Sequence, residues 1–268
     1  MDRSIDPPLS LPWRQAVILA AGRGSRMGRL TERQPKCLHA LAGKPLLAWT
    51  LDALRANGLS DVLVVGGWQH EALAPWCEHL RVNPQWASAN MVRSLLTARD
   101  WLARAPTLVV YGDGAYGPGA IAAALAAPEA QDIVVPVDRC WLDLWQRRFD
   151  DPLSDAETLR CEGDRLRDIG RRPESLAEIE GQFMGLLRLS MAGWRQVAAW
   201  LGRLAEARGD AAIDRLDTTA LLQGLLAADV PLHGANVHGG WVEIDSPQDA
   251  AVVEQALDQP GFRHDFRR

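Results

Sequence analysis

The chain has 268 residues, of which 47% are hydrophobic and 24% charged, and its formal net charge is −5. These values are typical of globular proteins, and the negative balance provides no basic field that would attract nucleic acid. No apolar run approaches the roughly 18 residues needed to span a bilayer. Residues 1–13 lack the charged-then-apolar order of a signal peptide. We therefore expect a cytoplasmic protein with a short N-terminal tail, no membrane span and no nucleic-acid partner.

The first part of the chain alternates short apolar runs with segments of helical spacing. Strands are expected at 16–20, 61–66, 80–83 and 107–111, and helices at 45–56, 71–77 and 91–103. Asn57 and Gly58 supply a stop for the first helix. This alternation predicts an α/β fold with a Rossmann-like, doubly wound, mostly parallel sheet and crossover helices.

After about residue 115 the pattern is looser. We expect helices at 121–127, 194–207 and 218–228, strands at 132–137, 184–189 and 240–244, and a hairpin at 160–166. A final helix should begin at Ser246 and Pro247. Residues 138–180 are rich in charge and turn residues, which indicates an insertion into the sheet fold.

A glycine-rich loop, LAAGRGSRM at 19–27, follows the first strand. Gly22 and Gly24 would let backbone N–H groups approach a phosphate chain. A dinucleotide fingerprint is the alternative, but Met27 stands where its third glycine would be, and no acidic residue closes the 61–66 strand. A Walker-type loop needs a following Gly-Lys-Ser/Thr, which is absent.

Three cations accompany this loop. Arg23 and Arg26 lie within it, and Lys36 follows Pro35. Arginine suits bidentate phosphate contacts, whereas lysine provides a compact positive charge. Because Pro35 restricts the local backbone, we expect Lys36 to be directed at one place.

Several further segments carry a resemblance to a known family. They are PKCL (35–38), LAGKPLL (41–47), NPQWASANMVRSL (83–95), YGD (111–113), GQFMGLL (181–187) and WVEID (241–245). With the glycine loop, they make the chain resemble the pyrophosphorylase-type nucleotidyltransferase superfamily, and within it the phosphocholine/phosphonate cytidylyltransferase-like branch. The resemblance implies one nucleotidyltransferase domain over 14–268, with a nucleotide-binding half (14–115) and an acceptor-binding half (116–268) that contains the substrate-side insertion.

The implied activity is transfer of CMP from CTP to a small phosphorylated or phosphonate acceptor, such as phosphocholine or 2-aminoethylphosphonate, with release of pyrophosphate. Two alternatives remain open. One is a sugar-1-phosphate or polyol-phosphate transferase that uses another nucleoside triphosphate. The other is a non-catalytic regulatory protein with the same fold. The apolar helices of the second half would suit a homodimer contact, although core packing explains them equally well.

The resemblance also assigns roles to single residues. Mg²⁺ is implied as the cofactor, held by Asp113 and Asp245, with Glu243 as a candidate third ligand. Lys36 is assigned to the α-phosphate and the attacking oxyanion, and Arg26 to the β- and γ-phosphates. As structural alternatives, Asp113 would be a turn residue and Asp245 a helix cap.

For the nucleotide, the resemblance implies a set of backbone and side-chain contacts. These are Leu19, Ala20, Ala21, Gly22, Arg23, Gly24, Ser25, Gly67, Asn83, Asn90 and Ser94. Arg23 would equally suit a solvent-facing position, and Asn90 an N-cap for the 91–103 helix. Side-chain identity alone does not separate CTP from UTP.

The acceptor side is represented by Trp141, Trp145, Asp155 and Phe183. Trp141 and Trp145 lie one helical turn apart, which suits either a core stripe or a cation–π wall for an ammonium group. The following loop adds carboxylates that would bind such a cation or simply solvate a surface loop, namely Asp150, Asp151, Asp155 and Glu157.

Overall fold

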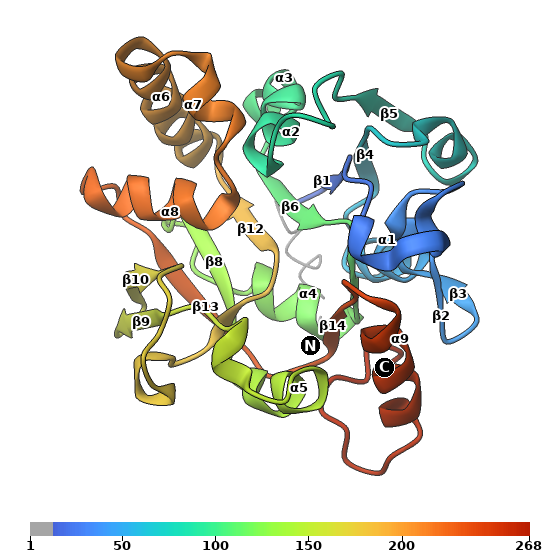
Figure 1. The fold of residues 1–268 in the computed structure, drawn as a ribbon. Coiled ribbons are helices and arrows are strands. Elements are labelled where there is room, and N and C mark those ends of the chain that lie inside the picture. Colours follow the sequence, from blue (N-terminus) through green and yellow to red (C-terminus); the bar gives the residue numbers. More distant parts are fainter. Residues whose placement is uncertain (1–12) are drawn as a thin grey trace, which may run out of the picture.

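The computed structural model describes residues 13–268, which fold around a ten-stranded sheet (Figure 1). The strand order is β5-β4-β1-β6-β12-β8-β13-β10-β9, and β11 pairs with β8 off this path. The strands are β1 (Gln15–Ala20), β4 (Asp61–Gly66), β5 (His79–Val82), β6 (Thr107–Tyr111), β8 (Ile133–Asp138), β9 (Leu159–Glu162), β10 (Arg165–Ile169), β11 (Gln182–Phe183), β12 (Leu186–Leu189) and β13 (His233–Val237). All of them except β10, β11 and β12 point the same way, so the expected α/β, mostly parallel sheet is confirmed.

The central strand β1 shows why its sequence is a continuous apolar run. Ile18 belongs to a hydrophobic cluster on one face of the sheet, and Val17 and Leu19 belong to a cluster on the other. All six of its residues are buried. Successive side chains of a strand point to opposite faces, so a strand covered on both faces needs apolar residues at every position.

Helices cover both faces of the sheet. The first cluster includes residues of α1 (Leu46–Ala56), α4 (Pro118–Leu125), α5 (Trp141–Arg148) and α9 (Pro247–Leu257). The second includes residues of α2 (Met91–Thr97), α3 (Arg99–Arg104), α6 (Met191–Arg208), α7 (Asp210–Asp214) and α8 (Thr218–Ala227). Over residues 13–268, none of the helices combines the length and the apolar character that crossing a membrane requires.

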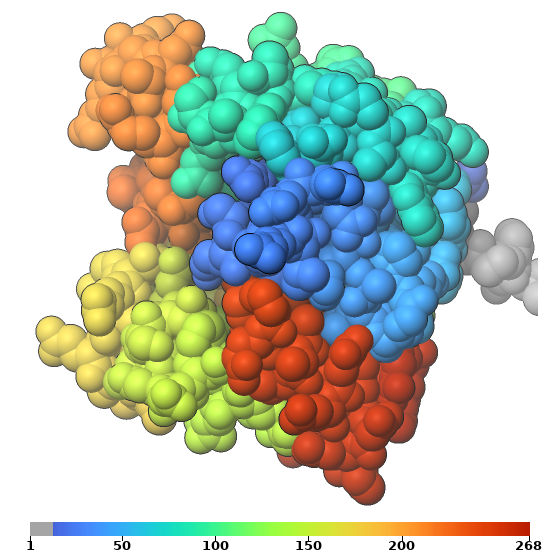
Figure 2. All heavy atoms as spheres, turned by 45° about the vertical axis from the view of Figure 1, so that its right-hand side comes forward, coloured from blue at the N-terminus to red at the C-terminus, as the bar shows by residue number. Residues whose placement is uncertain are grey.

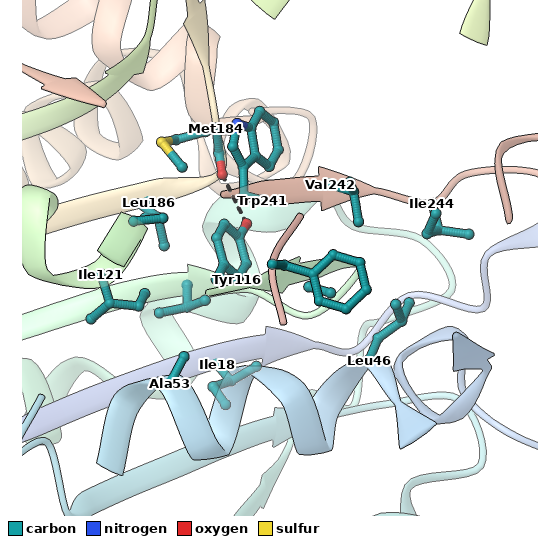
Figure 3. Close-up of a cluster of buried hydrophobic side chains, with 14 of the residues drawn as sticks. Ile18, Leu46, Ala53, Tyr116, Ile121, Met184, Leu186, Trp241, Val242 and Ile244 are labelled. Atoms are coloured by element: carbon teal, nitrogen blue, oxygen red, sulfur yellow. Dashed lines mark hydrogen bonds between the residues drawn. The ribbon is translucent and has the colours of Figure 1, made fainter. Parts of the chain in front are cut away.

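A small antiparallel sheet contributes residues to the first cluster. It consists of β7 (Gly114–Tyr116) and β14 (Trp241–Glu243). Within this sheet the rings of Tyr116 and Trp241 stack, with their centroids 6.0 Å apart. The Tyr116 hydroxyl donates a hydrogen bond of 2.8 Å to the Met184 carbonyl (Figure 3). The pairing places residues near 243 next to residues near 114, although they are far apart in the sequence.

Short elements complete the chain. A hairpin is formed by β2 (Ala40–Leu41) and β3 (Lys44–Pro45). Short 3₁₀ helices occur at Ser25–Thr31, Lys36–Leu38, His70–Trp76, Pro152–Ser154 and Leu176–Glu178. The last helix begins as predicted, because Ser246 and Asp249 form a reciprocal capping box with Pro247 at the first helical position.

Two expected helices differ in the structure, and one strand was missed. The segment at 71–77 is 3₁₀ rather than α-helical and contains Pro75. The helix expected at 91–103 is divided into α2 and α3, where the Thr97 hydroxyl bonds back to the Arg93 carbonyl. The strand expected at 240–244 is present as β14, which pairs with β7 outside the central sheet. Strand β13 was not predicted, because HGANV contains no apolar run.

Candidate active site

Three carboxylates converge where the small sheet meets the carboxyl end of β6. Oxygens of Asp113, Glu243 and Asp245 lie within 4.8 Å of one another. Asp113 links β6 to β7, and Glu243 is the last residue of β14. The Ile244 N–H group donates a 3.1 Å hydrogen bond to the Asp113 carbonyl. The β7–β14 pairing is therefore what joins the two halves of this acidic group.

Lys36 lies between two of these carboxylates. Its Nζ atom donates to Asp113 Oδ2 at 2.9 Å and to Asp245 Oδ1 at 2.8 Å. Burial acts to lower the pKa of Lys36, but the charges of Asp113 and Asp245 outweigh burial and raise the pKa above its ordinary value. Lys36 is therefore held as a buried cation within the acidic group.

The glycine loop supports the position of Lys36. Gly24 has a φ of +67°, and a methyl group on it would lie 2.8 Å from both Cβ and Cδ of Lys36. Only a residue without a side chain combines this left-handed backbone with such a close approach. The loop thus positions the lysine, in addition to exposing its own N–H groups.

Replacing Gly24 by alanine is expected to lower the turnover number while the protein stays folded. The added methyl group would displace Lys36, and the left-handed backbone would add strain of roughly 1–2 kcal/mol. Steady-state kinetics together with a thermal melt would measure both effects. Gly58→Ala is the matched comparison, because Gly58 lies after α1, away from the loop, and has a left-handed φ of +79° with nothing within 4 Å of an added methyl group. Equal turnover in the two variants would contradict this role of Gly24.

Arg26 reaches the same group from the surface. Its Nη2 atom lies 2.9 Å from Asp245 Oδ1, although 66% of its side chain is exposed. In the space-filling view the blue part of the chain near the N-terminus lies directly against the red part near the C-terminus (Figure 2). The exposed arginine is therefore free to exchange its carboxylate partner for an arriving anion.

The electrostatics of the group suit a bound cation. Burial, helped by the neighbouring Asp245, raises the pKa of Glu243 to about 7. Burial also opposes the ionisation of Asp245, yet Lys36, Arg26 and Arg148 together hold its pKa below the ordinary value. Asp113 Oδ1 is buried and has no hydrogen-bond partner within residues 13–268. An unpaired buried carboxylate oxygen is costly, and a hard metal ion would satisfy it.

Arg148 is a site residue that sequence reasoning missed. Its side chain is fully buried and forms ion pairs with Glu243, Asp245 and Asp249. It is the last residue of α5, in the segment WQRRF, which belongs to no motif quoted above. No local pattern in the sequence indicates that a helix end in the second half lies behind these carboxylates.

The loop at 20–25 leaves β1 between its neighbours β4 and β6. Gly67 follows β4 and packs against the loop, since a methyl group on it would lie 2.5 Å from the Ala21 carbonyl oxygen. The backbone N–H group of Trp68 donates to the same carbonyl at 3.0 Å. The Arg23 guanidinium lies 5.0 Å from the centroid of the Trp68 ring. The glycine loop and the end of β4 are thus in direct contact.

The other residues expected at the nucleotide have partners within the protein. Asn83 donates to Ser94 Oγ at 3.1 Å, and both side chains are buried. Asn90 caps α2 by accepting from the Met91 N–H group at 2.8 Å. These side chains hold the 83–94 segment in its conformation.

A cavity of about 280 Å³ opens beside the carboxylates. It is lined by the aromatic rings of Tyr111, Tyr116, Trp145, Phe183 and Trp241. It is also lined by the carboxyl groups of Asp155, Glu157, Asp217, Glu243 and Asp245. Rings and carboxylates together are suited to a cationic organic group.

Three of the four residues expected on the acceptor side line this cavity, namely Trp145, Asp155 and Phe183. Trp145 also donates its ring N–H group to Asp155 at 3.1 Å. Trp141 is outside the lining and packs edge-on against Trp145 in the core. Glu157, which the sequence offered beside Asp155, lines the cavity as well, whereas Asp217 was not anticipated because it stands in no motif.

The fold and this site together define an enzyme of nucleoside triphosphates. A glycine loop follows the central strand, a buried lysine bridges two carboxylates, and a cavity opens beside them. Residues 16–220 match the family model described as the MobA-like NTP transferase domain. The chain belongs to this family and is a nucleotidyltransferase.

Curated relatives are consistent with this assignment. CTP:phosphoglutamine cytidylyltransferase of Campylobacter jejuni is 29% identical over 249 residues, which cover 88% of this chain and 98% of that protein. CMP-5′-(3-aminopropyl)phosphonate synthase of Streptomyces rubellomurinus is 36% identical over 140 residues, which cover 49% of this chain but only 22% of the relative. This chain thus matches only a minor part of the second relative's length.

Solved structures show the same fold. CTP:phosphocholine cytidylyltransferase from Streptococcus pneumoniae superposes with a TM-score of 0.68 at 19% identity, covering 91% of this chain and 99% of that one. The inositol-1-phosphate CTP transferase from T. maritima gives a TM-score of 0.70 at 18% identity, covering 92% and 97%. The Rossmann-like nucleotidyltransferase architecture is therefore shared along nearly the whole chain.

Proposed function

We propose that the protein transfers CMP from CTP to a small phosphorylated or phosphonate acceptor that carries an ammonium group, with release of pyrophosphate. The observation that carries this proposal is the cavity lined by rings and carboxylates directly beside Asp113, Glu243 and Asp245. The names of the relatives support it, because they describe cytidylyl transfer to phosphoglutamine and synthesis of a CMP-aminopropylphosphonate.

In this reaction an oxygen of the acceptor attacks the α-phosphorus of CTP. A new P–O bond forms, the bond from the α-phosphorus to the bridging oxygen breaks, and pyrophosphate leaves with those electrons. The protein contributes mainly alignment and charge neutralisation. Lys36 would stabilise the charge that gathers on the α-phosphate, and Arg26 would turn from Asp245 to the β- and γ-phosphates.

Mg²⁺ fits the residues that the site offers. Asp113, Asp245 and Glu243 would hold it through carboxylate oxygens, the ligand type that this ion prefers. When bound, the ion would neutralise phosphate charge. The unpaired Asp113 Oδ1 is the specific feature that favours a metal at this place over a purely structural cluster.

The nucleotide would lie along the glycine loop, with its triphosphate on the backbone from Leu19 to Ser25. Gly67 and the 83–94 segment border this loop and would hold the base and ribose. Asn83, Asn90 and Ser94 would act mainly by shaping this border, since their side chains already have partners.

Asp155, Glu157 and Asp217 would receive the ammonium group of the acceptor. Burial, together with the charge of Asp217, raises the pKa of Glu157 to about 7. Asp155 adds to this effect, and Thr219, whose hydroxyl lies 3.4 Å from Glu157 Oε1, opposes it. A carboxylate with few compensating cations is suited to a positively charged ligand.

The efficiency with which the acceptor is used is expected to fall as the pH drops below about 7. Glu157, with its raised pKa, becomes neutral there and no longer attracts an ammonium group. Measuring kcat/KM for the acceptor against pH in the wild type and in Glu157→Gln tests this. The acceptor's own ionisation affects both proteins alike, so the difference between the two profiles isolates Glu157. Identical profiles would exclude it from the acceptor site.

Pyrophosphate release tests the function as a whole. The assay would combine CTP, UTP, ATP and GTP with phosphocholine, 2-aminoethylphosphonate, phosphoglutamine and a sugar 1-phosphate. We expect release with CTP and an ammonium-bearing acceptor. A preference for the sugar phosphate would support the sugar transferase alternative, and no release with any pair would support a regulatory protein.

A further inference from the structure

Arg148 is the most completely buried cation near the active site. None of its side chain is exposed, and every nitrogen of the guanidinium group has a carboxylate partner. Nη1 lies 3.1 Å from Glu243 Oε2, Nη2 lies 3.1 Å from Asp245 Oδ2, and Nε lies 3.0 Å from Asp249 Oδ1. One rigid group therefore contacts three acidic residues of the segment 243–249.

Arg148 contacts a different oxygen of Asp245 from the one that Lys36 and Arg26 contact. Lys36 and Arg26 both bind Asp245 Oδ1, whereas Arg148 binds Asp245 Oδ2. The arginine thus holds Asp245 from behind and leaves its other oxygen directed toward Asp113 and Lys36. A planar fork defines the rotamers of its partners, which a single ammonium charge cannot do.

Asp249 extends this control to the backbone. Its Oδ1 atom accepts from Arg148, while its Oδ2 atom accepts from the N–H groups of Asp245 and Ser246 at 3.0 and 2.9 Å. Both the side chain and the main chain of Asp245 are therefore tied to the same guanidinium group, directly or through one residue.

Helix α5 connects this network to the second substrate. It carries Trp145, which lines the cavity and whose ring centroid lies 5.3 Å from the Arg148 guanidinium carbon. The same helix contacts α9, which begins at Pro247 (Figure 1). The wall of the acceptor cavity and the anchor of the carboxylates are thus parts of one element.

We propose that Arg148 is a positioning residue that orients Glu243 and Asp245 as metal ligands, and that it acts through them without touching either substrate. This inference rests on the proposed function, because it presumes that the acidic group binds Mg²⁺. Outer partners of metal ligands typically contribute 10–100-fold to metal affinity. We expect a loss of that size when the fork is removed.

The test compares Arg148→Gln and Arg148→Lys with the wild type. Mn²⁺, a paramagnetic substitute for Mg²⁺, would be titrated into each protein and the free ion followed by electron paramagnetic resonance. The Mg²⁺ concentration that gives half-maximal pyrophosphate release would be measured in parallel. Arg147→Gln is the matched control, because Arg147 is the preceding residue of α5 and contacts Asp143, Gln259 and the Phe262 ring. Within residues 13–268 it forms no ion pair with Glu243, Asp245 or Asp249.

We expect Arg148→Gln to weaken Mn²⁺ binding 10–100-fold and to raise the half-activating Mg²⁺ concentration similarly. At saturating Mg²⁺ its kcat should return to near the wild-type value. The Mn²⁺ affinity of Arg148→Lys should lie between that of Arg148→Gln and that of the wild type. A merely structural role would instead lower the active fraction and leave the metal dependence unchanged.

Unchanged Mn²⁺ affinity in the folded variants, judged by circular dichroism, would overturn the proposal. If Arg148→Gln fails to fold, Arg148→Lys decides by the same criterion. Failure of the proposed function would look different, because the wild type itself would then release no pyrophosphate from CTP with any ammonium-bearing acceptor, whatever its Mn²⁺ affinity.

Discussion

Replacing Lys36 by alanine is expected to slow CMP transfer at least about 100-fold. This corresponds to roughly 2.7 kcal/mol, the lower end for loss of one preorganised donor that stabilises charge in a transition state. Lys36 suits that role because it is buried, ionised and held by two hydrogen bonds to Asp113 and Asp245. Pyrophosphate release at saturating substrates measures the effect.

The same substitution should act in the opposite direction on metal binding. In the free protein the Lys36 ammonium group binds Asp113 Oδ2 and Asp245 Oδ1, which are among the oxygens that a metal would use. Removing this ammonium group frees those oxygens for a metal, whereas Arg148 contacts Asp245 only at Oδ2 and therefore does not compete for them. We therefore expect Lys36→Ala to bind Mn²⁺ without nucleotide at least as tightly as the wild type.

Lys44→Ala provides the control for Lys36. Lys44 pairs with Asp52 on the surface and lies over the Trp49 ring, away from the acidic group. Its removal should leave both turnover and Mn²⁺ affinity unchanged. Turnover near the wild-type value in Lys36→Ala would refute the assignment of Lys36 to the α-phosphate.

Replacing Asp245 by asparagine is expected to abolish transfer and to destabilise the protein by about 3 kcal/mol. Removal of one partner from a buried ion pair typically costs 3–5 kcal/mol, and an amide oxygen retains part of the hydrogen bonding. Asp245 is the partner of Lys36, Arg26 and Arg148 together, and only 9% of its side chain is exposed. Urea denaturation of the metal-free protein measures the change in the free energy of unfolding.

Asp113→Asn is the informative comparison. Asp113 has Lys36 as its ion-pair partner and one unpaired buried oxygen, so its loss removes less favourable energy from the folded state. Both variants should lose activity, but Asp113→Asn should be clearly the more stable one. Equal stability of Asp245→Asn and the wild type would show that the three cations are not held by Asp245 in solution.

The local features of the site could be predicted from the sequence. The run at 16–20 identifies a strand buried on both faces, because every position is apolar. The glycines after it and the cations at 23, 26 and 36 indicate a phosphate-binding loop, since the chemistry of those residue types is expressed over a few neighbouring positions. The pairing of Asp113 with Asp245 came from the family resemblance, and no periodicity in the chain predicts it.

Contacts between distant segments were decided only by the tertiary structure. The β7–β14 sheet joins Gly114 to Glu243, and α5 brings Arg148 behind Asp245. The acceptor cavity likewise combines Glu157 with Asp217 from the start of α8. Such contacts depend on how whole elements pack, and neither a local period nor a motif encodes them. The sequence alone therefore determined the loop and the cations that we propose for the triphosphate, whereas the packing of the second half determined how the carboxylates are held and which side chains line the cavity beside them.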